Sequence, residues 1–76
     1  MTKYTWSARN DDNTIWLRGD GESYRDRKAW RATIIKINEM AKELGIDKGT
    51  KLRTTLIWKG RKMVRTVEIG KDWTKE

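Results

Sequence analysis

Cysteine and histidine are both absent from this chain of 76 residues. Without cysteine there is no disulfide framework and no thiolate metal site, and a reducing compartment is permitted. Without histidine the chain also lacks the commonest general acid or base and the commonest transition-metal ligand. We therefore expect a module that is not an enzyme and that holds no cofactor and no metal ion.

Long apolar segments are absent as well. No uninterrupted apolar run approaches the roughly 18 residues of a membrane-spanning helix, and residues 1–5 lack the apolar stretch of a signal peptide. The expected location is the cytoplasm. A chain of this length lies near the lower limit for folding without disulfides or metal, so we expect one small domain over residues 1–76.

Acidic residues are scarce relative to basic ones, and the net charge is +7. Residues 1–22 hold three basic and four acidic side chains (−1), whereas residues 23–76 hold fifteen and seven (+8). A basic field of this size favours a polyanionic partner. It also keeps a small domain soluble and protects an exposed strand edge, which needs no partner.

Two segments rich in strand formers open the chain, Lys3–Arg9 and Thr14–Arg18. The turn composition Asn10–Asn13 separates them, and Gly19–Gly21 follows the second. We therefore expect an antiparallel hairpin whose second strand ends at these glycines. The residues that this hairpin contributes to the core are expected to include Tyr4 and Trp6.

Alternation along the second segment leaves two orientations open. Trp16 points opposite to Ile15 and Leu17, so either Trp16 or this apolar pair faces solvent. In the first case Trp16 and Arg18 form an exposed pair on which a nucleic-acid base can stack.

A helix is expected over about residues 24–44. Ser23 and Asp26 resemble a capping box, and no Gly or Pro interrupts the chain before Gly45, which favours the left-handed position that ends many helices. Apolar side chains recur every three or four residues and define a buried stripe. The stripe consists of Trp30, Thr33, Ile34, Ile37, Met40, Ala41 and Leu44.

Two further strands are expected over Lys51–Lys59 and Lys62–Ile69, joined by a turn of either Lys59-Gly60 or Gly60-Arg61. Both turns give the same two faces. The core side holds Leu52, Thr54, Leu56, Trp58, Met63, Arg65, Val67 and Ile69. The other side holds Arg53, Thr55, Ile57, Lys59, Lys62, Val64, Thr66 and Glu68.

The element order predicts an α+β fold of the type ββαββ, with one helix packed on a four-stranded antiparallel sheet. On its core side, Arg65 either reaches solvent at the sheet edge or pairs with Asp26 or Glu68. An unpaired edge strand also allows two copies to join as a homodimer.

Four segments carry a resemblance to a known group: Trp16–Gly21, Ala41–Gly45, Gly60–Met63 and Gly70–Asp72. In this order they resemble a group of small uncharacterised bacterial domains with a Trp-containing first hairpin, a helix, and a closing hairpin that ends in a Gly-x-Asp tail. The resemblance covers residues 14–73 and implies the fold but no activity. The helix departs from the group's pattern because it is not Ala-rich.

Basic side chains gather on one helix flank and on the closing hairpin. At 100° per residue, the flank residues fall within an arc of about 80° that points away from the core stripe. These flank residues are Arg27, Arg31, Ile35, Asn38 and Lys42, so Ile35 is expected to be exposed. The tail over residues 70–76, with Trp73, is expected either to hang loose or to pack back.

Two functions follow from this pattern. The first is a nucleic-acid-binding module, for DNA or RNA, that contacts phosphates through the closing hairpin and the helix flank. Its predicted contacts are Arg27, Arg31, Lys42, Lys51, Arg53, Lys59, Arg61, Lys62 and Trp16. The alternative is a small protein-binding modulator or inhibitor, of phage or mobile-element origin, that docks on an acidic protein through Ile35, Ile57 and Val64.

Overall fold

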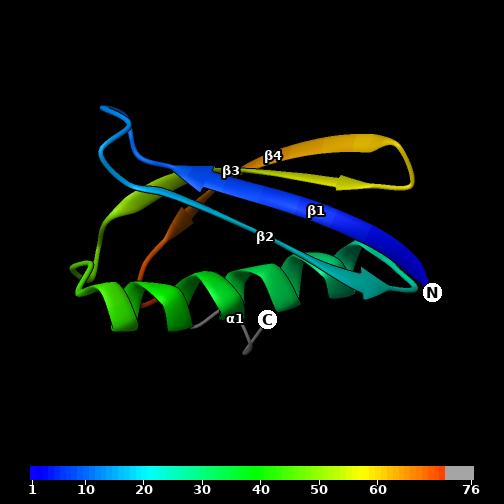
Figure 1. Ribbon diagram of the computed structural model, residues 1–76, viewed down its shortest axis with the longest axis horizontal. Coiled ribbons are helices and arrows are strands. Elements are labelled where there is room, and N and C mark those ends of the chain that lie inside the picture. The colour runs from blue at the N-terminus through cyan, green and yellow to red at the C-terminus, as the bar shows by residue number, and fades with distance from the viewer. Residues whose placement is uncertain (72–76) are drawn as a thin grey trace.

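The computed structural model describes residues 1–71 and has the element order ββαββ. The elements are β1 (Thr2–Arg9), β2 (Trp16–Ser23), α1 (Asp26–Leu44), β3 (Lys51–Trp58) and β4 (Arg61–Glu68). The strands form one antiparallel sheet in the order β2-β1-β3-β4, and α1 lies across one face of it (Figure 1). The α+β fold predicted from the sequence is confirmed.

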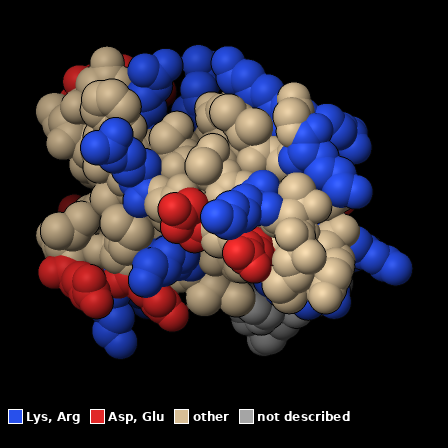
Figure 2. All heavy atoms as spheres, turned by 45° about the vertical axis from the view of Figure 1, so that its right-hand side comes forward, with Lys and Arg blue, Asp and Glu red and all other residues tan. Residues whose placement is uncertain are grey.

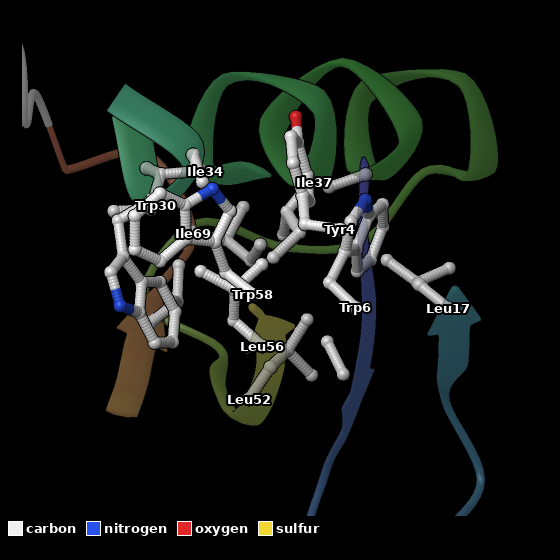
Figure 3. Packing of buried hydrophobic residues seen from close by; sticks show 14 residues of the cluster. Tyr4, Trp6, Leu17, Trp30, Ile34, Ile37, Leu52, Leu56, Trp58 and Ile69 are labelled. Carbon is white, nitrogen blue, oxygen red and sulfur yellow. The ribbon is translucent and has the colours of Figure 1, made fainter. Parts of the chain in front are cut away.

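The core fills the space between α1 and the sheet. Figure 3 shows Tyr4, Trp6 and Leu17 on one side of this core, with Trp30, Trp58 and Ile69 on the other. Every strand contributes alternate residues, as the two-residue period of a strand requires. Tyr4 and Trp6 are buried as expected, and Leu17 is buried while Trp16 is exposed, which decides between the two orientations left open above.

The second strand does not end at its glycines. Gly19 and Gly21 lie inside β2 and pair with Trp6 and Tyr4 of β1. Each glycine faces α1, where the ring of its cross-strand partner covers it, and a Cβ built on Gly19 would lie 2.8 Å from the Trp6 ring. These glycines therefore make room for two buried rings and do not break the strand.

The helix begins later than the sequence predicts, and the capping box does not form. Arg25 is the N-cap residue, with no side-chain cap, and α1 starts at Asp26. The Ser23 hydroxyl bonds to Arg25, the residue that precedes the helix. It donates to the carbonyl of Arg25 at 2.7 Å and accepts from the Arg25 N–H at 3.2 Å. Ser23 is the last residue of β2, so these two hydrogen bonds stabilise the connection between β2 and α1.

Leu44 is the one error in the predicted buried stripe, since it is 65% exposed. Gly45 adopts the left-handed conformation (φ 71°), as expected, and turns the chain at the end of α1. Ile46 then donates its N–H to the Ala41 carbonyl at 2.8 Å and packs against the core. A contact of this kind accompanies many glycine-terminated helices, so Ile46 covers the end of the core and Leu44 is left in solvent.

The turn of the closing hairpin is Lys59-Gly60, because Trp58 pairs with Arg61 and Leu56 with Met63. Both turn residues have positive φ (52° and 74°), the arrangement that favours glycine and suits a two-residue hairpin. Lys59 therefore belongs to the turn and not to β3, and its ammonium lies 5.0 Å from the centroid of the Trp58 ring.

Arg65 is exposed on the edge strand β4, which is the first of the alternatives given above. Its guanidinium lies 5.0 Å from the centroid of the Trp30 ring, and no ion pair joins it to Asp26 or Glu68 within residues 1–71. Among these residues no helix has the length and apolar character needed to cross a membrane. The expectations about Asp72 and Trp73 concern positions outside the described residues.

We predict that Gly19→Ala destabilises the fold by about 1–3 kcal/mol, because the buried Trp6 ring cannot move away from the new methyl group. Urea denaturation followed by circular dichroism measures the change. Asp20→Ala is the matched control on the exposed side of the same strand and is expected to change stability by less than about 0.5 kcal/mol. Equal unfolding midpoints for Gly19→Ala and the unmodified protein would contradict this account of the strand.

Candidate functional site

The side of the sheet that faces away from α1 carries no covering element within residues 1–71, and we call it the open face. Alternate residues of all four strands build it. They are Lys3, Thr5, Ser7 and Arg9 of β1; Trp16, Arg18, Asp20 and Glu22 of β2; Lys51, Arg53, Thr55 and Ile57 of β3; and Lys62, Val64, Thr66 and Glu68 of β4. Figure 2 shows Lys and Arg gathered along the top and right of the view, on the sheet side of the molecule.

One row of the open face combines an aromatic ring with two arginines. Arg9 of β1 pairs with Trp16 on β2 and with Arg53 on β3, so the three side chains stand beside one another across the sheet. Trp16 is 67% exposed, although a Trp side chain is usually largely buried. Arg18 follows two residues further along β2 on the same face, and it and Trp16 line a shallow depression.

The two arginines of this row have no acidic partner. Residues 1–71 contain one ion pair with an N···O distance below 4.0 Å, between Lys36 and Glu39 on α1. No carboxylate of this part of the chain lies that close to Arg9 or Arg53. Like charges directly opposite each other across a ladder destabilise a sheet. We therefore expect the pair Arg9 and Arg53 to be unfavourable, with Asp11, which lines a depression together with both arginines, offsetting part of the repulsion.

Next to this row lies a depression lined by hydroxyl groups and an exposed isoleucine. Its lining includes Thr5, Ser7, Thr55 and Ile57, with Trp16 and Arg18 toward one end and the carboxylate-bearing Asp20 opposite Thr5. Ser7 pairs with Arg18 on one side and Thr55 on the other, so hydroxyl donors and acceptors stand between the arginines and the apolar part of the face. Lys62, opposite Ile57, adds a positive charge about 14 Å along the strands from Arg53.

The structure distributes the predicted contact residues over three places. The open face holds Trp16, Lys51, Arg53 and Lys62. The β3–β4 turn region holds Lys59 and Arg61. The helix α1, in the other layer, holds Arg27, Arg31 and Lys42.

All nine predicted side chains are exposed, but the helix group cannot contact a ligand that lies on the open face. Asn38 also leaves the helix flank, because it is half-buried and accepts the Gly70 N–H at 2.8 Å. Ile35, at 42% exposure, faces solvent as expected.

Arg9 is the main residue that the sequence prediction missed. Alternation alone places it opposite the buried Tyr4, Trp6 and Ala8, and so on the open face. Its importance comes from Arg53, however, and the two residues meet only because β1 lies beside β3 in the sheet. No local pattern in the sequence reports that strand order.

The acidic β1–β2 loop is explained by its own hydrogen bonds. The Thr14 hydroxyl donates to Asp12 Oδ1 at 2.8 Å and so lowers the pKa of this carboxyl below its usual value. Asn10 Oδ1 accepts the Ile15 N–H at 3.0 Å, which closes the loop. Over residues 1–71 no group of three or more acidic side chains is arranged to hold a metal ion.

In comparisons with known proteins, no protein-family model, curated protein or solved structure matches the chain. The resemblance to the small bacterial domains remains a prediction.

We predict that the like-charge pair makes the stability of the protein depend on salt. Raising NaCl from about 0.01 M to about 1 M screens the repulsion between Arg9 and Arg53, so the free energy of unfolding should rise. In Arg53→Gln this rise should be smaller by about 0.2–1 kcal/mol. Urea denaturation at the two salt concentrations measures the difference.

Lys28→Gln removes the same charge from an exposed position on α1 and is the matched control. If its salt response falls as much as that of Arg53→Gln, the effect belongs to net charge and not to the pair.

Proposed function

We propose that this protein is a non-catalytic module that binds single-stranded nucleic acid on the open face of its sheet. The observation that carries the proposal is the row Trp16–Arg9–Arg53, in which an exposed ring adjoins two arginines without an acidic partner in the described chain. Single strands are held by such combinations, because bases stack on aromatic rings while cationic side chains neutralise phosphates.

The shape of the open face favours a single strand over a duplex. A sheet with short side chains at Thr5, Ser7 and Thr55 presents a shallow surface, and its depression is too open to enclose a small molecule. An unpaired strand can lie flat on such a surface and offer one base to Trp16. The surrounding hydroxyl groups can donate to phosphate oxygens or accept from base edges.

A second candidate, docking of an acidic protein, is favoured by the apolar part of the same face. Ile57 and Val64 are 44% and 53% exposed and stand on neighbouring strands. Ile35 lies on α1 in the other layer, so the three residues predicted for this role do not form one patch. With two aliphatic side chains the patch is small for a protein interface, and this function ranks second.

We predict that Trp16→Ala weakens binding to a fluorescein-labelled mixed-sequence single-stranded DNA by about 5- to 150-fold, the loss expected when one stacked base is released. Fluorescence anisotropy at low salt measures the dissociation constant, and a mixed-sequence RNA of equal length is tested in parallel. Lys36→Gln, an exposed residue of α1, should bind like the unmodified protein.

We also predict that Arg9→Gln combined with Arg53→Gln reduces the slope of log K against log salt by about 1.4, which corresponds to two lost contacts with single-stranded phosphates. Lys28→Gln combined with Lys36→Gln removes the same charge from α1 and should leave the slope unchanged.

Two results would overturn the proposal. The first is the absence of any binding to DNA or RNA at low salt, where electrostatic affinity is greatest. The second is binding that responds equally to the open-face and the α1 variants. Loss of a protein complex in Ile57→Ser, without an effect on oligonucleotides, would support the second candidate instead.

A further inference from the structure

A groove lies between the first half of α1 and strand β4, on the side of the sheet opposite to the open face. Its lining consists of Asp26, Arg27, Trp30, Arg31, Ile34, Met63 and Arg65. The groove exists because α1 lies closest to β2 and leaves the helix-facing side of β4 partly uncovered. As a result Met63 is only partly buried, and Arg65 is exposed although its strand position points toward the helix layer.

The groove has an apolar floor and a basic rim. Three guanidinium groups and one carboxylate line the groove, and Asp26 Oδ1 accepts the backbone N–H of Arg27 at 2.7 Å. Within residues 1–71, none of the three arginines has an ion-pair partner within 4.0 Å. The Arg65 guanidinium lies over the Trp30 ring, 5.0 Å from its centroid, and a guanidinium can hold a carboxylate through two parallel hydrogen bonds.

One buried donor in the wall of the groove also lacks a partner. The Nε1–H of Trp30 has no hydrogen-bond acceptor in the described structure, although the residue is 97% buried. Figure 3 shows the Trp30 ring on the same side of the core as Ile69, away from Tyr4 and Trp6. An unpaired buried donor carries a free-energy cost, and Trp30, which lines the groove, carries it in the described structure.

Beside the groove, β4 offers an unpaired backbone edge. Within residues 1–71 it is the last strand of the sheet, and β3 is its one partner there. The residues that flank a two-residue turn form a hydrogen-bonded pair, so Arg61 and every second residue after it point their backbone groups toward β3. The N–H and C=O groups of Lys62, Val64 and Thr66 therefore point outward along this edge.

We propose that the groove and the free edge of β4 together form a docking site for an extended acidic peptide, which adds to the sheet as a fifth strand. Its backbone would pair with Lys62, Val64 and Thr66. Because side chains alternate along a strand, every second side chain of the peptide would enter the groove, where Arg65 meets a carboxylate. The intervening side chains would lie beside Val64 on the open face, which favours small or β-branched residues.

Charge favours this partner over a second copy of the chain. Two β4 strands side by side would bring together Arg61, Lys62 and Arg65 of each copy, six basic side chains against the two Glu68 carboxylates. The β2 edge of a second copy would turn Leu17, Gly19, Gly21 and Ser23 toward the helix layer, so it would bring no carboxylate into the groove. The site is independent of the proposed nucleic-acid surface, which uses side chains from the opposite face.

The test uses the full chain and an eight-residue blocked peptide in which glutamate alternates with valine or threonine, labelled with fluorescein. Anisotropy should detect saturable binding, and hydrogen exchange followed by NMR should show the amides of Lys62, Val64 and Thr66 protected at least about tenfold. Two control peptides each change one property. The first has every amide N-methylated, so it keeps the negative charge but loses the backbone donors. The second has lysine in place of each glutamate, so it keeps the backbone donors but reverses the charge. Both should fail to bind.

Arg65→Gln should weaken peptide binding by about tenfold, and Arg65→Lys should weaken it less, because it keeps the charge but loses the planar fork. Lys36→Gln is the control on α1, outside the groove. Trp16→Ala should leave peptide binding unchanged and Arg65→Gln should leave oligonucleotide binding unchanged, so failure of one site does not imply failure of the other.

The proposal is overturned if the N-methylated peptide binds as well as the parent, if protection appears on amides other than those three, or if Arg65→Gln and Lys36→Gln behave alike. Displacement of the peptide by an oligonucleotide that Arg65→Gln no longer binds would assign the groove to nucleic acid instead.

Discussion

The packing of two aromatic rings onto two glycines determines where everything else in this fold lies. Trp6 and Tyr4 cover Gly19 and Gly21, positions where any side chain would collide with the rings. The rings occupy the space above these positions of β2, and α1 lies closer to β2 than to the other strands. The helix thus lies over one half of the sheet, and the helix-facing side of β4 is left incompletely covered.

The same glycines explain where prediction from the sequence succeeded and failed. Alternation predicts the faces of β1, β3 and β4 correctly, because a period of two does not depend on the neighbouring strand, and it leaves two orientations open for β2. Glycine is also frequent in turns, so Gly19 and Gly21 predict an end of β2 where the strand in fact continues. The error in the end of β2 also affects Ser23, which is predicted to cap the helix but is the last residue of the strand.

The candidate site was predictable in part by residue, since Trp16 and Arg53 were predicted and Arg9 was missed, and its arrangement was not predictable. Exposure of Trp16 was one of two orientations that alternation allowed, and the basic character of the closing hairpin followed from composition. What the sequence could not indicate is which strands are neighbours. The order β2-β1-β3-β4 brings Arg9 beside Arg53. Arg27 and Arg31 lie on α1, in the other layer, although charge alone predicts one surface that includes them and the basic residues of the sheet.

The two surfaces differ in which backbone groups they make available, and this difference assigns them to different partners. On the open face the inner strands spend their backbone hydrogen bonds within the sheet, so only side chains can contact a ligand there. Such a surface favours a flexible polyanion with stacking bases. Along β4, by contrast, alternate backbone groups point outward beside three arginines, and a regular ladder of donors and acceptors is complementary to another polypeptide strand. Under the two proposals, a basic protein of this size would distinguish two classes of anionic partner by geometry, although its net charge would attract both.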